Sequence, residues 1–446
     1  MRKKGNVDRR SFLSVAAGLA GATSKAPAMA SEGGKPVRAK PLRSTFYGPE
    51  SYDDKELAEL RDVLGKRRPF RWYGPGGQPP MKVLTFEKEL AGRMQTKYAL
   101  AVTSGTAALT TALAALGIGP GDEVILPAWS WYACFNSIVM QGALPVFVES
   151  DTSFNIDPTD LESKITPQTK VIMVVHTMGN PADLDPILAL ARERRIRLLE
   201  DCAQSLGGSY RGKPLGSIGD IGIYSFQIAK TISSGEGGAL VTNDPLLFER
   251  AARYHDLGLL RPPHQAMLGR VELEGMIGNQ YRMSEFTGAV LLAQLRKLDS
   301  IIAALRGHAR RVHEGIADLT GLHLRHRPDP AGDTGSNIWL GFPSQGHRDR
   351  FATAMGAENV PASLPMDVAL VPLQPYAEHK LTSHPDWPSF TSDRGRSIRY
   401  GSGCCPGTIA IHRRFAGVTL DPAYSRRDAD DIVAAIRKVY PAVVRA

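Results

Sequence analysis

Residues 169–204 have the sequence TKVIMVVHTMGNPADLDPILALARERRIRLLEDCAQ, in which two apolar runs flank a helical segment. The runs at 169–178 and 196–203 are almost continuously apolar, which is typical of strands covered on both faces. Between them, four apolar residues recur at the spacing of one helical face: Ile187, Leu188, Leu190 and Ala191. A strand, a helix and a second strand in this order predict two parallel strands of an α/β sheet.

The same kind of pattern extends over the central part of the chain. Five further apolar runs lie at 98–104, 123–129, 144–150, 221–226 and 238–243. We therefore expect a large α/β domain with a mainly parallel seven-stranded sheet, at residues 46–300. A long helical pattern follows Phe286, and a last helix is expected at 427–440. The segment 301–446 is predicted to form a smaller C-terminal α+β domain.

Composition and charge exclude some classes of protein. The chain has 446 residues, of which 43% are hydrophobic and 22% charged, so it is not a disordered chain and is long enough for two domains. Its net charge of +9 would favour an anionic partner, but residues 1–30 contain six Lys or Arg residues and one Asp. The remaining charge of +4 is too dilute to predict nucleic-acid binding.

The N-terminal segment has the layout of a twin-arginine signal peptide. Arg9 and Arg10 precede a short run of small and apolar residues, and Ala28-Met29-Ala30 forms a small-x-small cleavage site. We expect a signal peptide at 1–30, cleavage after Ala30, a linker at 31–45 and export to the periplasm or beyond. A basic disordered arm on a cytoplasmic protein is the alternative. No membrane span is expected in the mature protein.

Polar residues follow three of the predicted strands, at the sheet edge where α/β proteins bind ligands. One strand leads into Ser104-Gly105-Thr106, where a helix start favours an anion, although Ser and Thr are also ordinary helix caps. Another ends in Glu200-Asp201, which either caps a helix or balances a buried cation. A third leads to Lys230 beside a glycine-rich turn. Together they predict a phosphorylated, cationic, carbonyl-bearing ligand, which describes pyridoxal 5'-phosphate.

Six motifs in fixed order resemble the DegT/StrS-type family of pyridoxal-phosphate-dependent sugar aminotransferases. They are SGTAAL at 104–109, GDEVI at 121–125, EDCAQ at 200–204, SFQIAK at 225–230, GEGG at 235–238 and YRMSE at 281–285. The resemblance covers nearly the whole chain from about Phe46. It implies the fold type I aminotransferase fold and a homodimer whose active sites are shared between subunits.

The resemblance also implies roles for individual residues. Lys230 would form the Schiff base with the cofactor and carry the proton during transamination, because a desolvated lysine loses its charge readily. Asp201 would face the pyridine nitrogen and keep it protonated, which leaves Glu200 a structural role. These two residues, Lys230 and Asp201, are the predicted catalytic pair, and no metal site is expected.

Further cofactor contacts are implied by the same resemblance. Gln204 would contact the ring hydroxyl, and the phosphate would be held by Ser104, Gly105, Thr106 and Ser225. Trp131 would stack on the ring, a core tryptophan being the alternative. The family often places Asn before Tyr-Arg to reach the phosphate of the neighbouring subunit. This chain has Asn279 and Gln280 there, so either is a candidate, and Arg282 is expected to be structural.

Other polar residues are assigned less specifically. Arg71, His176 and the segment 363–367 are candidates for binding the acceptor substrate, with structural roles as the alternative. The basic clusters at 192–197 and 412–414 are interpreted as solvated surfaces. The four cysteines are interpreted as packing or loop residues rather than a disulfide framework: Cys134, Cys202, Cys404 and Cys405.

The function that these observations predict is transamination. Glutamate or glutamine would donate an amino group to a keto sugar, a keto-cyclitol or a related keto-acid sugar, by a ping-pong mechanism through Lys230. One alternative is a different pyridoxal-phosphate reaction on the same scaffold. Another is an exported sensory protein that binds the cofactor without turnover.

Overall fold

The computed structural model describes residues 28–43, 51–72 and 81–445. The twin-arginine motif at 9–10 and most of the predicted signal peptide lie outside the described residues. No helix in the described part of the chain is long and apolar enough to cross a membrane.

The core of the molecule is a seven-stranded sheet with the strand order β1-β9-β8-β5-β4-β2-β3. Its strands are β1 (Tyr98–Val102), β2 (Glu123–Pro127), β3 (Leu144–Val148), β4 (Thr169–Val175), β5 (Arg197–Asp201), β8 (Ile221–Ser225) and β9 (Gly238–Thr242). Only β9 is antiparallel to its neighbours, β1 and β8, and the other pairs are parallel. The prediction of a mainly parallel seven-stranded sheet is therefore confirmed.

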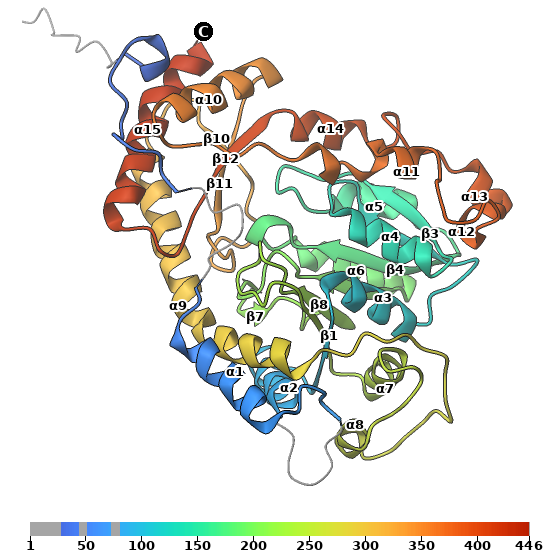
Figure 1. The fold of residues 1–446 in the computed structure, drawn as a ribbon. Coiled ribbons are helices and arrows are strands. Elements are labelled where there is room, and N and C mark those ends of the chain that lie inside the picture. Colours follow the sequence, from blue (N-terminus) through green and yellow to red (C-terminus); the bar gives the residue numbers. More distant parts are fainter. Residues whose placement is uncertain (1–27, 44–50, 73–80, 446) are drawn as a thin grey trace, which may run out of the picture.

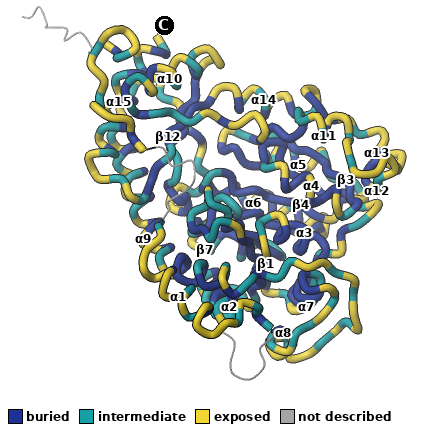
Figure 2. The backbone as a smooth tube through the Cα atoms, in the orientation of Figure 1, coloured by how far each residue is buried: buried dark blue, intermediate teal, exposed yellow. Residues whose placement is uncertain are grey.

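The strands are apolar along their length because helices cover both faces of the sheet. Leu100 and Val102 of β1 pack into a cluster with α3 (Gly105–Ala115), α4 (Tyr132–Met140) and α7 (Pro245–Tyr254). Ala99 and Ala101 of the same strand face the opposite cluster, with α2 (Lys82–Arg93) and α6 (Leu184–Arg194). The strands lie buried between these layers, and the exposed residues lie on the outer helices and loops (Figure 2).

A single long helix connects the two halves of the molecule. α9 (Glu285–Ile316) begins at Ser284, whose side chain accepts a hydrogen bond from the Thr287 N–H. It runs from α1 (Asp54–Lys66) and α2 to the C-terminal sheet (Figure 1). Because its buried face continues from Leu291 to Ile316, the helix is unbroken at residue 300, where the sequence places the domain boundary.

The C-terminal part contains a small antiparallel sheet covered by helices. The strands β10 (His323–Leu324), β11 (Asn337–Gly341) and β12 (Phe415–Thr419) pair in that order. The helices α10 (Gln345–Ala357) and α15 (Arg426–Arg445) pack beside this sheet, and α15 includes the helix predicted at 427–440. The expectation of an α+β unit after the long helix agrees with this arrangement.

Shorter elements lie between these layers. They are α5 (Pro158–Lys164), α8 (Pro262–Leu268), α11 (Pro375–Glu378), α12 (Pro388–Thr391), α13 (Asp393–Ser397), α14 (Pro406–His412), and the hairpin β6 (Ser209–Tyr210) and β7 (Lys213–Pro214). Phe390 and Tyr400 pack into the same cluster as α3 and α4. This part of the predicted small domain therefore lies on the large sheet.

The segment 28–43 packs along the C-terminal part of the molecule. The side chain of Met29 is buried, and the Ala30 N–H donates to Glu358 Oε1 at 2.8 Å. The Val37 N–H donates to the other oxygen of Glu358 at 2.9 Å, and Arg38 forms ion pairs with two aspartates of α15. Both sides of the predicted cleavage point, and the described part of the predicted linker, thus contact the folded chain.

Candidate active site

A cavity of about 670 Å³ opens at the carboxyl ends of β1, β4, β5 and β8. Residues that the sequence places after three separate strands come together there, as the rule for α/β sheets requires. Eight of the predicted site residues line the cavity: Ser104, Gly105, Thr106, Trp131, Asp201, Gln204, Ser225 and Lys230.

One end of the cavity is formed by the N-terminus of α3. Ser104 caps this helix, its Oγ accepting the Ala107 N–H at 3.0 Å, so its side chain holds the helix start in place. A Cβ added at Gly105 would lie 2.7 Å from Ser225 Cβ, so only glycine fits there. The free N–H groups at the helix start and the hydroxyl of Thr106 form a cradle suited to a phosphate group.

Asp201 is the last residue of β5 and is buried. Its Oδ1 accepts the Ala203 N–H at 2.9 Å, and its Oδ2 accepts the thiol of Cys134 at 3.1 Å. Two hydrogen bonds therefore hold the carboxylate at the cavity wall, a suitable position for pairing with a protonated ring nitrogen.

Lys230 lies in the turn after β8, where its backbone N–H donates to the Gln227 carbonyl at 2.9 Å. Desolvation lowers the pKa of its amine, while the negative charges of Asp201 and Glu236 oppose this shift. Among the described residues, none hydrogen-bonds to Lys230 Nζ. The amine is thus an accessible base and nucleophile inside the cavity.

Two further side chains complete the wall. Trp131 precedes α4 and is half-buried against the cavity, whereas Trp129, two residues earlier, is buried in the core. The alternative of a core residue therefore does not apply to Trp131. Gln204 accepts the Met178 N–H at 2.9 Å through Oε1, which fixes the amide and turns Nε2 away from that bond. Both side chains are placed to contact a planar, polar ring.

Comparison with known proteins agrees with this geometry. Residues 55–392 match the model of the DegT/DnrJ/EryC1/StrS aminotransferase family. The chain belongs to this family. Among solved structures, 3-amino-5-hydroxybenzoic acid synthase has a TM-score of 0.73 and 26% identity, covering 91% of this chain and 100% of that one. DesV from S. venezuelae has a TM-score of 0.70 and 28% identity, covering 86% and 93%.

Three curated relatives indicate the range of chemistry in this aminotransferase family. GDP-perosamine synthase from Escherichia coli O157:H7 is 41% identical over 53% of this chain and 64% of its own length. GDP-perosamine synthase from Vibrio cholerae is 33% identical over 78% and 95%. L-glutamine:2-deoxy-scyllo-inosose aminotransferase from Streptoalloteichus tenebrarius is 39% identical over 52% and 56%. The first and third matches thus span less than two thirds of those relatives.

Two substrate candidates in this aminotransferase have structural roles instead. His176 is fully buried, with Nε2 3.1 Å from Glu200 and Nδ1 accepting the Ala182 N–H. Arg71 is buried, pairs with Glu87 at 2.7 Å and stacks on Trp72 at 4.1 Å. Neither residue lines the cavity, so the prediction that they bind the acceptor is wrong for the described chain. The sequence around Arg71 and His176 does not indicate that Glu87 and Glu200 are their partners.

Glu200 has the structural role that the sequence analysis expected. Its two oxygens accept the backbone N–H groups of Gly216, Ile218 and Gly219, at 2.6 to 2.9 Å. Burial alone would raise the pKa of Glu200, but the bond to His176 and these N–H groups outweigh it and lower the pKa. The carboxylate thus fixes the loop between β7 and β8.

Asn279 and Gln280 do not line the cavity of their own chain. Both are exposed, and Asn279 Nδ2 donates to the hydroxyl of Tyr254 at 3.1 Å. Their predicted contact involves a second subunit, so it stays a prediction. Arg282 pairs with the buried Asp256, as expected for a structural residue.

The C-terminal part of the chain contributes one wall of the cavity, which the sequence did not predict. Ser336, Asn337 and Thr419 line the cavity from β11, β12 and the loop before β11, and Glu236 lines it from the turn before β9. Of the segment 363–367, the cavity is lined by Met366. The sequence carried no signal for Ser336, Asn337 and Thr419, because single small polar residues are common in loops and at the ends of strands alike.

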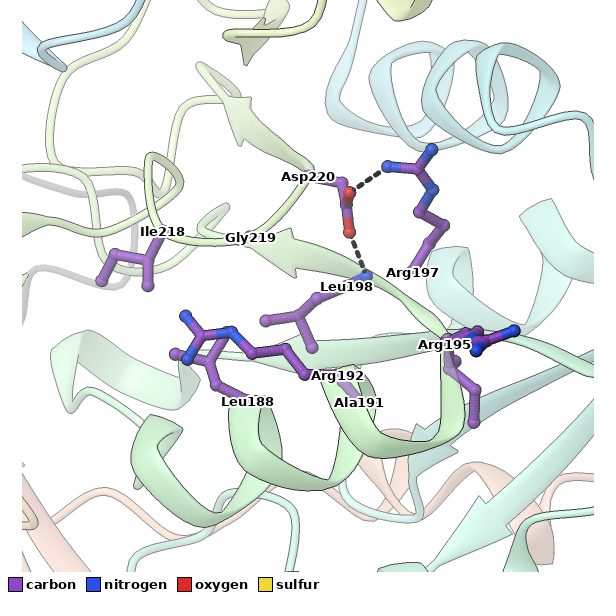
Figure 3. A pocket seen from close by; sticks show the side chains of 10 residues that line it. Leu188, Ala191, Arg192, Arg195, Arg197, Leu198, Ile218, Gly219 and Asp220 are labelled. Carbon is purple, nitrogen blue, oxygen red and sulfur yellow. Dashed lines mark hydrogen bonds and ion pairs between the residues drawn. The ribbon is translucent and has the colours of Figure 1, made fainter.

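The basic cluster at 192–197 lies at the opposite edge of the sheet, at the amino ends of β5 and β8 (Figure 3). Arg192, Arg195 and Arg197 are exposed around a shallow cavity of about 470 Å³. Arg197 pairs with Asp220, which also accepts the Leu198 N–H at 2.7 Å. The interpretation of this cluster as a solvated surface agrees with these exposures.

Proposed function

We propose that this protein is a pyridoxal-phosphate-dependent transaminase that transfers an amino group from glutamate or glutamine to a keto sugar, keto-cyclitol or keto-acid sugar. The observation that carries the proposal is the meeting of Lys230, Asp201 and the start of α3 in one cavity. The curated names of the relatives, which include perosamine synthases and a glutamine:inosose aminotransferase, support the choice of substrates.

The residues present fit this cofactor. The start of α3 and Ser225 would hold the phosphate, Asp201 the ring nitrogen, Gln204 the ring hydroxyl and Trp131 the ring face. When bound, pyridoxal phosphate supplies a reactive carbonyl carbon and a ring that accepts an electron pair. Gly105 lets the start of α3 approach Ser225 closely, because any Cβ there would lie 2.7 Å from Ser225 Cβ.

Lys230 would act as the general base that accepts and releases the proton. Its lowered pKa increases the neutral fraction of the amine near pH 7, and only the neutral amine can attack a carbonyl or accept a proton. Its Nζ would accept a proton from the substrate carbon and release it again within the cavity, because it lines the cavity and no described residue hydrogen-bonds to it. Asp201 would hold the ring nitrogen in its protonated form, because a buried carboxylate at the cavity wall favours a positively charged partner.

Substitution of Lys230 tests the proposal. Purified protein supplied with pyridoxal phosphate is expected to show the visible absorbance of lysine-linked cofactor, and glutamate or glutamine should convert it to the amino form. Lys230→Ala should abolish both, whereas Lys213→Ala, at an exposed lysine of the β6–β7 hairpin, should change neither. An unchanged spectrum in Lys230→Ala contradicts the assignment.

The same measurement separates the alternatives. If the wild-type protein binds the cofactor but neither donor converts it, the protein either catalyses another reaction on this scaffold or binds the cofactor without turnover. Product analysis with candidate keto sugars then distinguishes these two cases. A chemically altered sugar indicates another reaction, and an unreacted sugar indicates binding without turnover.

We also propose a homodimer with shared active sites. Asn279 and Gln280 are exposed, and Leu257, Leu259 and Ile277 of the same region expose 57%, 49% and 93% of their surface. A second copy of the chain would cover these apolar side chains. It would also bring Asn279 or Gln280 to the phosphate cradle of its partner.

Mixing two inactive variants tests the shared site. One variant carries Lys230→Ala and the other carries Asn279→Ala with Gln280→Ala. Hybrid dimers contain one site with both an intact lysine and intact partner residues, so activity should reappear on mixing and subunit exchange. Dimers that regain no activity would mean that each site is complete within one chain.

Export by the twin-arginine route remains a separate proposal, supported by the sequence around Arg9 and Arg10. Cleavage after Ala30 would remove the buried Met29 side chain and the Ala30 N–H bonded to Glu358. Cell fractionation with intact-mass measurement tests the route and the cleavage point. A cytosolic protein that keeps Met1 would contradict both.

A further inference from the structure

Cys134 lies in the first turn of α4 with its side chain fully buried. Its Sγ is 3.1 Å from Asp201 Oδ2, although the two residues are 67 positions apart in the chain. The other carboxylate oxygen, Oδ1, accepts the Ala203 N–H at 2.9 Å. Each oxygen of Asp201 thus has one donor, and the donors come from two different elements.

The first turn of α4 contacts both the cavity and the Asp201 carboxylate. Trp131 and Ala133 line the cavity, whereas Cys134 does not and faces the back of Asp201. The Cys134 N–H donates to the Trp131 carbonyl at 3.0 Å, which closes this turn. The turn therefore connects the wall tryptophan directly to the carboxylate.

The thiol can act only as a donor in this position. Burial and the neighbouring negative charge of Asp201 raise the pKa of Cys134 well above its ordinary value, so the thiol keeps its proton. A protonated thiol beside a carboxylate donates an S–H···O bond without adding charge.

We propose that Cys134 is a positioning residue that fixes the rotation of the Asp201 carboxylate through its S–H···Oδ2 hydrogen bond. With one donor on each oxygen, the plane of the carboxylate is fixed, and Asp201 keeps one free lone pair on each oxygen at the cavity that it lines. This inference rests on the proposed function, because it assigns the use of that direction to the ring nitrogen of the cofactor. Cys134 is not a catalytic residue, since it does not line the cavity.

Two substitutions of similar size separate positioning from packing. Cys134→Ser keeps a donor in place of the thiol, whereas Cys134→Ala removes it. We expect Cys134→Ala to weaken pyridoxal phosphate binding about fivefold or more and Cys134→Ser to restore most of it. In ¹⁵N-labelled cofactor, the ring nitrogen signal should move toward the unprotonated position in Cys134→Ala alone. Cys404→Ala, at a half-buried cysteine not lining the cavity, is the matched control.

A measurement without cofactor tests the hydrogen bond itself. The S–H stretching band of Cys134, identified by its loss in Cys134→Ser, should lie at the lower frequency of a hydrogen-bonded thiol and rise in Asp201→Asn. A band that does not respond to Asp201→Asn overturns the inference. So does a Cys134→Ser variant that matches Cys134→Ala in cofactor affinity and ring nitrogen signal.

Failure of the proposed function gives a different result. A wild-type protein that binds no pyridoxal phosphate refutes the cofactor assignment and with it the positioning role toward the ring nitrogen, even if the S–H band shows the bond to Asp201. Normal cofactor binding with no effect of Cys134→Ala refutes the positioning role and leaves the proposed function intact.

Discussion

Glu358 and Lys438 form an ion pair at 2.9 Å beneath the N-terminal arm, with Glu358 fully buried. The same carboxylate accepts the N–H groups of Ala30 and Val37, so one side chain joins the arm, α10 and α15. The arm is therefore part of the folded C-terminal half, and its stability is coupled to the ionisation of Glu358.

Replacing Glu358 by Gln tests this coupling. The neutral amide leaves Lys438 without its charge partner, so the free energy of unfolding should fall by about 2 kcal/mol near pH 7. Urea denaturation measures the change, and limited proteolysis should show earlier cleavage within residues 31–43. The exposed Glu314 offers the control, because Glu314→Gln should leave both measurements unchanged. Equal stability of the two variants would contradict the role of Glu358.

The buried pair of Arg71 and Glu87 predicts a pH dependence of stability. Burial would raise the pKa of Glu87, but the attraction of Arg71, the nearby His264 and the hydrogen bond from the Ala101 N–H outweigh it and lower the pKa from 4.5 to about 2. Because the folded pKa is the lower one, the stabilisation is complete above pH 4.5 and is lost as the pH falls toward 2.

The shift corresponds to about 3 kcal/mol. Urea unfolding at a series of pH values should therefore show a steeper acid loss for the wild type than for Glu87→Gln, which has no carboxyl group to titrate. Near neutral pH the variant should itself be less stable, because Arg71 stays buried without a partner. Parallel curves for the two proteins would rule out the proposed shift.

Gly105 is expected to be intolerant of a side chain. A Cβ there would lie 2.7 Å from Ser225 Cβ, so Gly105→Ala must push the start of α3 away from β8. We expect a loss of about 1–3 kcal/mol in stability and much weaker pyridoxal phosphate binding. Gly119→Ala is the matched control, because nothing lies within 4 Å of the added carbon. Thermal unfolding and equilibrium dialysis measure the two effects.

The amine of Lys230 should titrate below an ordinary lysine in the cofactor-free protein. Desolvation disfavours its charged form, while Asp201 opposes this effect and raises the pKa. Labelling of Lys230 by an amine reagent, followed by mass spectrometry, should reach half its maximum below pH 10.5. Asp201→Asn removes the opposing charge and should lower this midpoint further. A midpoint that rises in Asp201→Asn would contradict the electrostatic account.

The sequence by itself determined the main sheet and the edge of that sheet at which Asp201 and Lys230 lie. Continuous apolar runs arise when strands are covered on both faces, so their number and order could be found by inspection, and all seven are present. Asp201 is the last residue of β5 and Lys230 lies in the turn after β8, and carboxyl ends of parallel strands share one edge of a sheet. Topology was therefore sufficient to predict that these two side chains lie at one edge of the sheet, whereas their catalytic roles are implied by the family resemblance and stay predictions.

Only the tertiary structure decided what each remaining polar residue contacts. Cys134 and Asp201 are 67 residues apart, and no periodic pattern connects them. Arg71 and His176 have the chemistry of substrate ligands, yet folding buries both against glutamates. The neighbours of a side chain depend on which distant elements pack against it. The spacing of apolar residues along the sequence shows only whether a helix or strand is buried on one face or on both. The sequence therefore specified the sheet and the edge at which Asp201 and Lys230 lie, and the packing of distant elements specified the groups that hold them.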